Sequence, residues 1–132
     1  MSFKAPVSDF RFLFDHIVDY GQLAGTPLFA EAGAEVTDQI LTEAGRLSAE
    51  VMAPLNRAGD LTPAKLENGV VRTPPGFADG YRAIAEGGWI GLAASPDHGG
   101  MGLPLALNTA VNDMMSGACL ALQLCPLLTQ GQ

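Results

Sequence analysis

The sequence predicts a mostly α-helical fold with at most one small β-hairpin. Several stretches repeat apolar residues every three or four positions, the spacing of the buried face of a helix. Sixteen glycines and nine prolines interrupt the chain of 132 residues, so the helices are expected to be short. A hairpin is expected at residues 65–72, where a strong turn signal stands between two short flanking runs. The length allows a single domain with a modest core.

The first helix is expected to follow Ser8, whose hydroxyl can cap a first turn. Gly21 or Gly25 is expected to end it, because glycine commonly stands just after a helix. A small-residue stretch then leads to the next helix. The apolar positions of the first helix are Phe10, Phe14 (or Leu13) and Ile17.

The strongest helical pattern in the first half covers residues 36–53. Thr37 can cap it, and Pro54 is expected to stop it or to lie in a frayed last turn. The two faces of this helix are clearly separated. The polar face carries Glu43, Arg46 and Glu50, and the apolar stripe consists of Ile40, Leu41, Ala44, Leu47, Val51 and Met52.

The second half of the chain begins with the predicted hairpin, in which Asn68-Gly69 supplies the turn. A helix is expected over residues 77–86, with Gly87-Gly88 closing it. After a loop rich in glycine and proline, another helix begins near Pro104 and runs toward Gly117. Further helical sequence follows from about 119 to 128, with Pro126 as the expected break.

Charge excludes some partners. The net charge is −7, and the seven basic residues are scattered between Lys4 and Arg82, so we expect no nucleic-acid partner and no polybasic membrane surface. The N-terminus lacks the apolar core of a signal peptide. Cys119 and Cys125 are expected to be reduced, buried thiols of a cytoplasmic protein. Two cysteines and two histidines are too few and too dispersed for a metal site.

The last nineteen residues, 114–132, carry no charge at all. A membrane span is the least favoured explanation, because polar residues and a proline interrupt a stretch that is barely long enough. A buried core helix of this domain is a second explanation. A small helical domain rarely covers one helix on all sides, however. We therefore favour burial of this segment against protein that is not part of this chain.

The loop Ser95–Pro104 contains Gly99, Gly100 and Gly102, which permit positive φ angles and close backbone approach. The loop does not match the glycine pattern of a dinucleotide site, and it lacks the lysine of a P-loop. We therefore favour tight packing of this loop over direct binding of phosphate.

Residues 88–104, an aromatic residue followed by Gly-Leu and then Pro-Asp-His-Gly-Gly-Met-Gly, resemble the N-terminal signature of the acyl-CoA dehydrogenase family. Asp97 and His98 stand where that family more often has Glu and a spacer one residue longer. Three further runs resemble the 3-methylmercaptopropionyl-CoA dehydrogenase-like branch, and the likeness extends in order over residues 1–132. These runs are Phe3-Lys4-Ala5-Pro6, residues 51–60 and Asn68-Gly69-Val70-Val71.

The resemblance implies the N-terminal helical domain of the acyl-CoA dehydrogenase fold, without the flavin-binding β-domain and the C-terminal helical domain. It implies that the parent enzyme oxidises the Cα–Cβ bond of an acyl-CoA thioester with FAD as hydride acceptor, and that it is a homo-oligomer. The catalytic Glu of the family lies downstream, so no catalytic, cofactor-binding or metal-binding residue is expected here. The glutamates that we exclude are Glu31, Glu35, Glu43, Glu50 and Glu86.

By its order along the motif, the helix after the glycine loop is implied to line the acyl pocket. The residues expected near the substrate are Met115, Cys119, Leu122, Gln123 and Pro126. The fragment alone is expected to be inactive and not to bind FAD. An alternative function remains open: a non-catalytic helical interaction domain that docks a partner through its apolar C-terminal helix.

Overall fold

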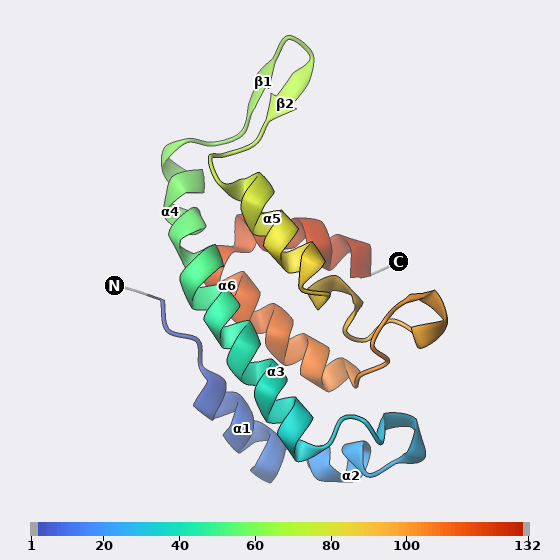
Figure 1. The fold of residues 1–132 in the computed structure, drawn as a ribbon. Coiled ribbons are helices and arrows are strands. Elements are labelled where there is room, and N and C mark those ends of the chain that lie inside the picture. Colours follow the sequence, from blue (N-terminus) through green and yellow to red (C-terminus); the bar gives the residue numbers. More distant parts are fainter. Residues whose placement is uncertain (1–2, 131–132) are drawn as a thin grey trace.

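The computed structural model describes residues 3–130 and is mostly helical, with one hairpin that projects from the helical body (Figure 1). Met1, Ser2, Gly131 and Gln132, which belong to the predicted leaderless N-terminus and to the charge-free segment, lie outside the described residues. The predicted fold class is confirmed. The elements are α1 (Val7–His16), α2 (Tyr20–Ala24), η1 (Pro27–Phe29), α3 (Ala34–Leu47), η2 (Ser48–Met52), α4 (Ala53–Leu61), β1 (Lys65–Glu67), β2 (Val70–Arg72), α5 (Phe77–Glu86), η3 (Trp89–Gly91), η4 (Pro96–His98) and α6 (Leu105–Gln130).

The first helix starts earlier and ends earlier than predicted. The Pro6 carbonyl accepts hydrogen bonds from the backbone N–H groups of Asp9 and Phe10, so Ser8 lies inside the first turn and does not cap it. α1 ends at His16, and Gly21 belongs to the separate helix α2, which Gly25 follows. The prediction was wrong because α2 was too short to show a helical period.

α3 begins at Ala34, three residues before the predicted cap. Thr37 is buried, and its Oγ1 lies 3.1 Å from the Ala32 carbonyl oxygen and 3.3 Å from the Tyr20 hydroxyl. The Thr37 side chain therefore joins α3 to the segment before it and to α2. The capping role predicted for Thr37 was wrong because its hydroxyl serves this tertiary contact.

Pro54 does not stop the helix. α3, η2 and α4 follow one another without a gap, as the teal and green rod in Figure 1 shows. η2 is a π-helical turn in which the Ala53 N–H bonds to the Ser48 carbonyl, five residues earlier. Proline in a helix clashes with the carbonyl four residues before it, here that of Glu50, and a widened turn relieves this clash.

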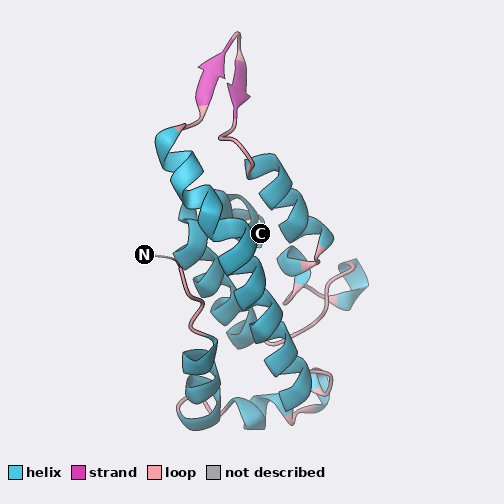
Figure 2. Cartoon of the chain, turned by 60° about the vertical axis from the view of Figure 1, so that its left-hand side comes forward, coloured by secondary structure: helices cyan, strands magenta, loops and turns pink. Residues whose placement is uncertain are grey.

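The predicted hairpin is present, with Leu66 opposite Val71. Asn68 and Gly69 both have positive φ angles, 50° and 78°, as a two-residue turn between right-twisted strands requires. Every strand residue is exposed, and Figure 2 shows the hairpin standing clear of the helices. α5 then spans Phe77–Glu86, as predicted.

α6 folds back on itself. Cys119 has extended angles, φ −156° and ψ 87°, inside an otherwise helical segment. Asn112 and Gln130 would lie roughly 27 Å apart in a straight helix, yet their side chains are 2.8 Å apart. We call residues 105–118 the first arm and residues 120–130 the second arm. The break expected between Gly117 and Cys119 is confirmed, whereas the break at Pro126 is wrong because the second arm continues through it.

By length and composition, α6 is the one described helix that could cross a membrane, with a mean hydropathy of 1.2. Each arm alone is shorter than the about 20 residues that a span needs. The inner face of α6 instead forms the centre of the core, where it packs against α3, η2 and α4. The core residues with the least exposed side chains include Leu41, Ala44, Met52, Ile84, Leu92, Leu107, Val111, Met114 and Met115.

Coverage of α6 is incomplete. Leu120, Leu124 and Leu128 are 54%, 46% and 70% exposed, and they repeat every four residues on the second arm. These three side chains form one stripe because positions four apart share a helix face. The expectation that this domain cannot cover the charge-free helix on all sides is therefore confirmed. We call these residues the leucine stripe.

Candidate functional site

An apolar groove lies between α5, the second arm of α6 and the base of the hairpin. Its volume is about 580 Å³. Figure 1 shows these elements near one another although they are far apart in the sequence. The groove is lined by Gly59, Pro63, Ala64, Thr73, Pro74, Phe77, Ala78, Tyr81, Ala121, Leu122 and Cys125.

Glycines let the groove walls approach one another. A Cβ on Gly80 would lie 2.5 Å from Leu55 Cδ1 and 2.9 Å from Leu122 Cδ2, so the bare backbone of α5 makes room for leucines from α4 and α6. A Cβ on Gly59 would lie 2.9 Å from the Phe77 ring. These positions fix how closely α4, α5 and the second arm pack.

The chemistry available in the groove is limited. The polar side-chain groups of its lining are the hydroxyls of Thr73 and Tyr81 and the thiol of Cys125. The lining holds no carboxylate, imidazole or amine. Such a surface can hold an apolar chain.

The five predicted substrate-binding residues fall into two groups. Leu122 lines the groove, whereas the other four do not belong to its lining. All five are buried, which places four of them in the interior of this chain. Their role toward a substrate therefore stays a prediction. These four are Met115, Cys119, Gln123 and Pro126.

Sequence reasoning missed most of the groove. Phe77 and Tyr81 were assigned to the apolar side of a helix, and the residues at the base of the hairpin were assigned to an irregular stretch. The helical spacing of apolar residues does not distinguish a side chain in the core from one that lines a groove. The available signal was the pair of prolines, Pro63 and Pro74, that flank the hairpin.

Three amide side chains tie the second arm to the rest of the fold. Gln123 Nε2 donates to Asn112 Oδ1 (2.9 Å), and Asn112 Nδ2 donates to Gln130 Oε1 (2.8 Å). Gln130 Nε2 in turn donates to the backbone carbonyls of Ile90 (3.1 Å) and Trp89 (3.3 Å). We call this chain of hydrogen bonds the amide relay.

The glycine-rich loop uses its own backbone donors. Seven successive N–H groups, from Asp97 to Leu103, donate within the segment 91–103. Gly99 and Gly102 have positive φ angles of 81° and 64°. A phosphate cradle needs free N–H groups that point at the anion. The N–H groups of this loop are therefore engaged in its own packing.

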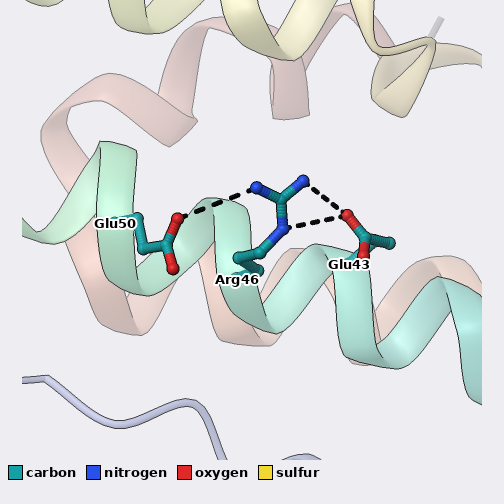
Figure 3. Close-up of polar contacts among 3 residues, drawn as sticks. All are labelled: Glu43, Arg46 and Glu50. Carbon is teal, nitrogen blue, oxygen red and sulfur yellow. Dashed lines mark hydrogen bonds and ion pairs between the residues drawn. The ribbon is translucent and has the colours of Figure 1, made fainter.

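The glutamates excluded on sequence grounds are all exposed. Figure 3 shows Arg46 between Glu43 and Glu50, at distances of 2.6 Å and 3.7 Å. The hydrogen bonds that Arg46 donates to the Glu43 carboxylate, and then the charges of both glutamates, raise the pKa of Arg46. This cluster is a solvated helix face.

A second, more polar hollow of about 690 Å³ lies between α4, the end of the first arm of α6 and Phe3. Its charged residues, Arg57 and Asp60, are exposed, so their charges are hydrated. Both cysteines are free, as predicted, but Cys125 is exposed and only Cys119 is buried. The prediction of two buried thiols was wrong for Cys125 because the second arm turns that position toward the groove. Residues 3–130 contain no cluster of three metal-ligating side chains.

Comparison with known proteins gives one strong similarity. The chain is 36% identical over 131 residues to 3-methylmercaptopropionyl-CoA dehydrogenase of Ruegeria pomeroyi (strain ATCC 700808 / DSM 15171 / DSS-3). The match covers 99% of this chain but 22% of that protein. No protein-family model matches the chain. The resemblance seen in the sequence is confirmed, and the chain is homologous to part of an acyl-CoA dehydrogenase.

Proposed function

We propose that this chain is the N-terminal helical portion of a cytoplasmic, homo-oligomeric, FAD-dependent acyl-CoA dehydrogenase. In that enzyme it packs against the remaining domains and lines the acyl pocket, and it is inactive by itself. The similarity to 3-methylmercaptopropionyl-CoA dehydrogenase supports this proposal. The observation that carries it is the apolar groove, which offers a wall for an acyl chain.

The flavin is held elsewhere in the parent enzyme. The seven engaged N–H groups of residues 97–103 leave no backbone donors for a pyrophosphate in that loop. No step of the redox reaction is therefore assigned to this chain. Its contribution is to bind the acyl chain and to exclude water from one side of it.

One of the predicted residues belongs to the wall of the groove. Leu122 lines the groove, whereas Met115, Cys119, Gln123 and Pro126 are buried in the interior, and their role toward an acyl chain stays a prediction. In the proposed parent enzyme, an acyl chain lies against Leu122, Phe77 and Tyr81. Burial of each methylene in such a groove contributes about 0.8 kcal/mol. Affinity is therefore expected to rise with acyl length.

The test is isothermal titration calorimetry, in which the 132-residue chain is titrated with acyl-CoA thioesters whose acyl chains increase in length. We expect weak binding that strengthens with acyl length, and none with free coenzyme A. Ala78→Trp fills the groove and should abolish binding. Ala85→Trp, on the same helix but outside the lining, should leave it unchanged. Equal binding by the two variants would refute the groove assignment.

The enzymatic part of the proposal has a separate test. With FAD, an acyl-CoA and an artificial electron acceptor, the chain alone should reduce no acceptor. Turnover by the chain alone would contradict the proposal. The coding sequence after the codon for Gln132 is also informative: a β-rich stretch and then a helical segment with a buried glutamate support it, and a stop codon argues against it.

The leucine stripe favours a second candidate. An exposed apolar row on a helix is typical of a surface that binds another protein. The chain would then be a non-catalytic interaction domain. Calorimetry separates the two functions, because an interaction domain has no reason to prefer longer acyl chains.

A further inference from the structure

The second arm of α6 is joined to the first arm through one non-helical residue. Cys119 carries the whole change of direction, with helix on both sides of it. A change in the φ and ψ angles of one residue can therefore swing the second arm without breaking a helical hydrogen bond in either arm. Such single positions at helix ends are where hinges are found.

The amide relay holds the second arm at both of its ends. Gln123 lies near its beginning and Gln130 is its last residue, and both bond to Asn112 of the first arm. Gln130 also bonds to the backbone of η3. All three amides donate through their NH₂ groups, and Asn112 and Gln130 also accept through their oxygens, so the relay runs in one direction from Gln123 through Asn112 to Gln130. A side chain that cannot both donate and accept at position 112 breaks it in the middle.

The relay is incomplete at one end. Gln123 Oε1 accepts no hydrogen bond from the described residues, although Gln123 is only 1% exposed. A buried acceptor without a donor raises the free energy of the closed arrangement. Opening of the second arm would let water reach this oxygen. The closed arm is therefore held by hydrogen bonds that water can replace, and it carries a built-in cost.

The position of the second arm sets the shape of the groove. The arm supplies Ala121, Leu122 and Cys125 to the lining, opposite α5. Leu122 packs against the bare backbone of Gly80, which has no side chain of its own to interlock with it. A swing of the arm about Cys119 would carry Leu122 away from Gly80 and widen the groove.

We propose that the second arm of α6 is a movable wall of the apolar groove, hinged at Cys119 and latched by the amide relay through Asn112. The device does not depend on which ligand the groove takes. It makes Asn112 the central residue of the latch, because that side chain bonds to both ends of the arm.

Cys119 reports the motion directly. It is 1% exposed when the arm is closed, and the substitution Cys125→Ser leaves it as the single thiol of the chain. The experiment measures the rate at which an aromatic disulfide reagent labels Cys119 in that background, at urea concentrations below the unfolding transition. Local opening gives a rate that does not depend on urea, whereas labelling through global unfolding rises steeply with it.

Asn112→Leu should raise the urea-independent labelling rate by about 10-fold, the effect on an opening equilibrium of losing one or two ordinary hydrogen bonds. Asn108→Leu is the matched control, since Asn108 is a buried asparagine on the first arm outside the relay. If Asn112→Leu does not fold, Gln130→Ala cuts the relay at the C-terminal end of the arm and should give a smaller increase. An unchanged rate, equal rates for the position-112 and position-108 variants, or labelling only through global unfolding would overturn the proposal.

Discussion

Gly100 lies so close to Ala94 that a Cβ on Gly100 would stand 2.1 Å from the Ala94 carbonyl oxygen. The two residues belong to opposite sides of the glycine-rich loop. The loop is closed by hydrogen bonds from Gly102 N–H to the Ala94 carbonyl and from Leu103 N–H to the Leu92 carbonyl. This contact brings the chain back beside η3 immediately before α6 begins. The loop therefore sets where the core helix starts.

Gly100→Ala should lower the free energy of unfolding by about 1–3 kcal/mol, because the methyl group can fit only if the backbone of the loop shifts. Gly21→Ala is the control, since nothing lies within 4 Å of a Cβ there and the residue is helical. The free energy of unfolding of that control should rise by about 0.5–1 kcal/mol. Urea denaturation followed by circular dichroism measures both, and a Gly100→Ala variant as stable as the wild type would contradict the packing role.

Much of the fold could be predicted from the sequence, because helix period and turn chemistry are local. The bounds of α5, the Asn68-Gly69 turn and the separation of two helical stretches near residue 119 are examples. Pro54 was misjudged because proline normally ends a helix, and a π-helical turn is invisible in a hydrophobic pattern. α2 was missed because five residues are too few to establish a period.

The candidate site was predicted less well. The expected pocket residues came from one helix, whereas the groove is assembled from the hairpin base, α5 and the second arm. Only the direction in which the second arm folds back decides that Leu122 faces the groove while Met115 faces the core. That direction depends on amides 11 and 18 residues apart, Gln123 and Gln130 with Asn112, which no local pattern connects.

Tyr20 should make the free energy of unfolding depend on pH in the alkaline range. Its ring is buried and stacks on Phe14, with centroids 4.5 Å apart, and burial raises its pKa above the ordinary 10.0, against a smaller opposing effect of the Thr37 hydrogen bond. The folded state therefore keeps the proton at a pH where the unfolded state has lost it. Stability from this group is complete below pH 10.0 and is lost as the pH rises toward the folded-state pKa.

Urea denaturation between about pH 8 and about pH 11 tests this expectation. Tyr20→Phe should lose about 0.5–1.5 kcal/mol at the lower pH, because the hydrogen bond to Thr37 is gone. The deficit should shrink as the pH rises, since phenylalanine cannot ionise. Tyr81→Phe, at an exposed position, should keep the wild-type pH dependence. A constant difference between Tyr20→Phe and wild type would show that Tyr20 does not cause it.

Two substitutions on α3 should show that its buried and exposed faces contribute very differently to stability. Leu41→Ala removes a side chain that is 1% exposed, and it should cost about 2–5 kcal/mol. Glu43→Gln weakens an exposed ion pair with Arg46, so its effect should be far smaller and should vanish at high salt. Thermal unfolding at low and high salt measures both. A large, salt-resistant loss for Glu43→Gln would mean that this glutamate is not merely solvated.

The leucine stripe should make the isolated chain self-associate. Leu124 and Leu128 lie on a surface that carries no charge, while the protein as a whole is acidic, so two copies meet with least repulsion along this arm. Light scattering over a range of concentrations should show a mass that rises above 13.7 kDa. Leu124→Glu and Leu128→Glu should each hold the chain at the monomer mass, because a carboxylate would be buried without a partner in the contact. Leu28→Glu, at a more exposed leucine on η1, should still associate like the wild type. A wild-type chain that stays monomeric at high concentration would contradict self-association. Association that persists in both glutamate variants would show that the contact surface is not the leucine stripe.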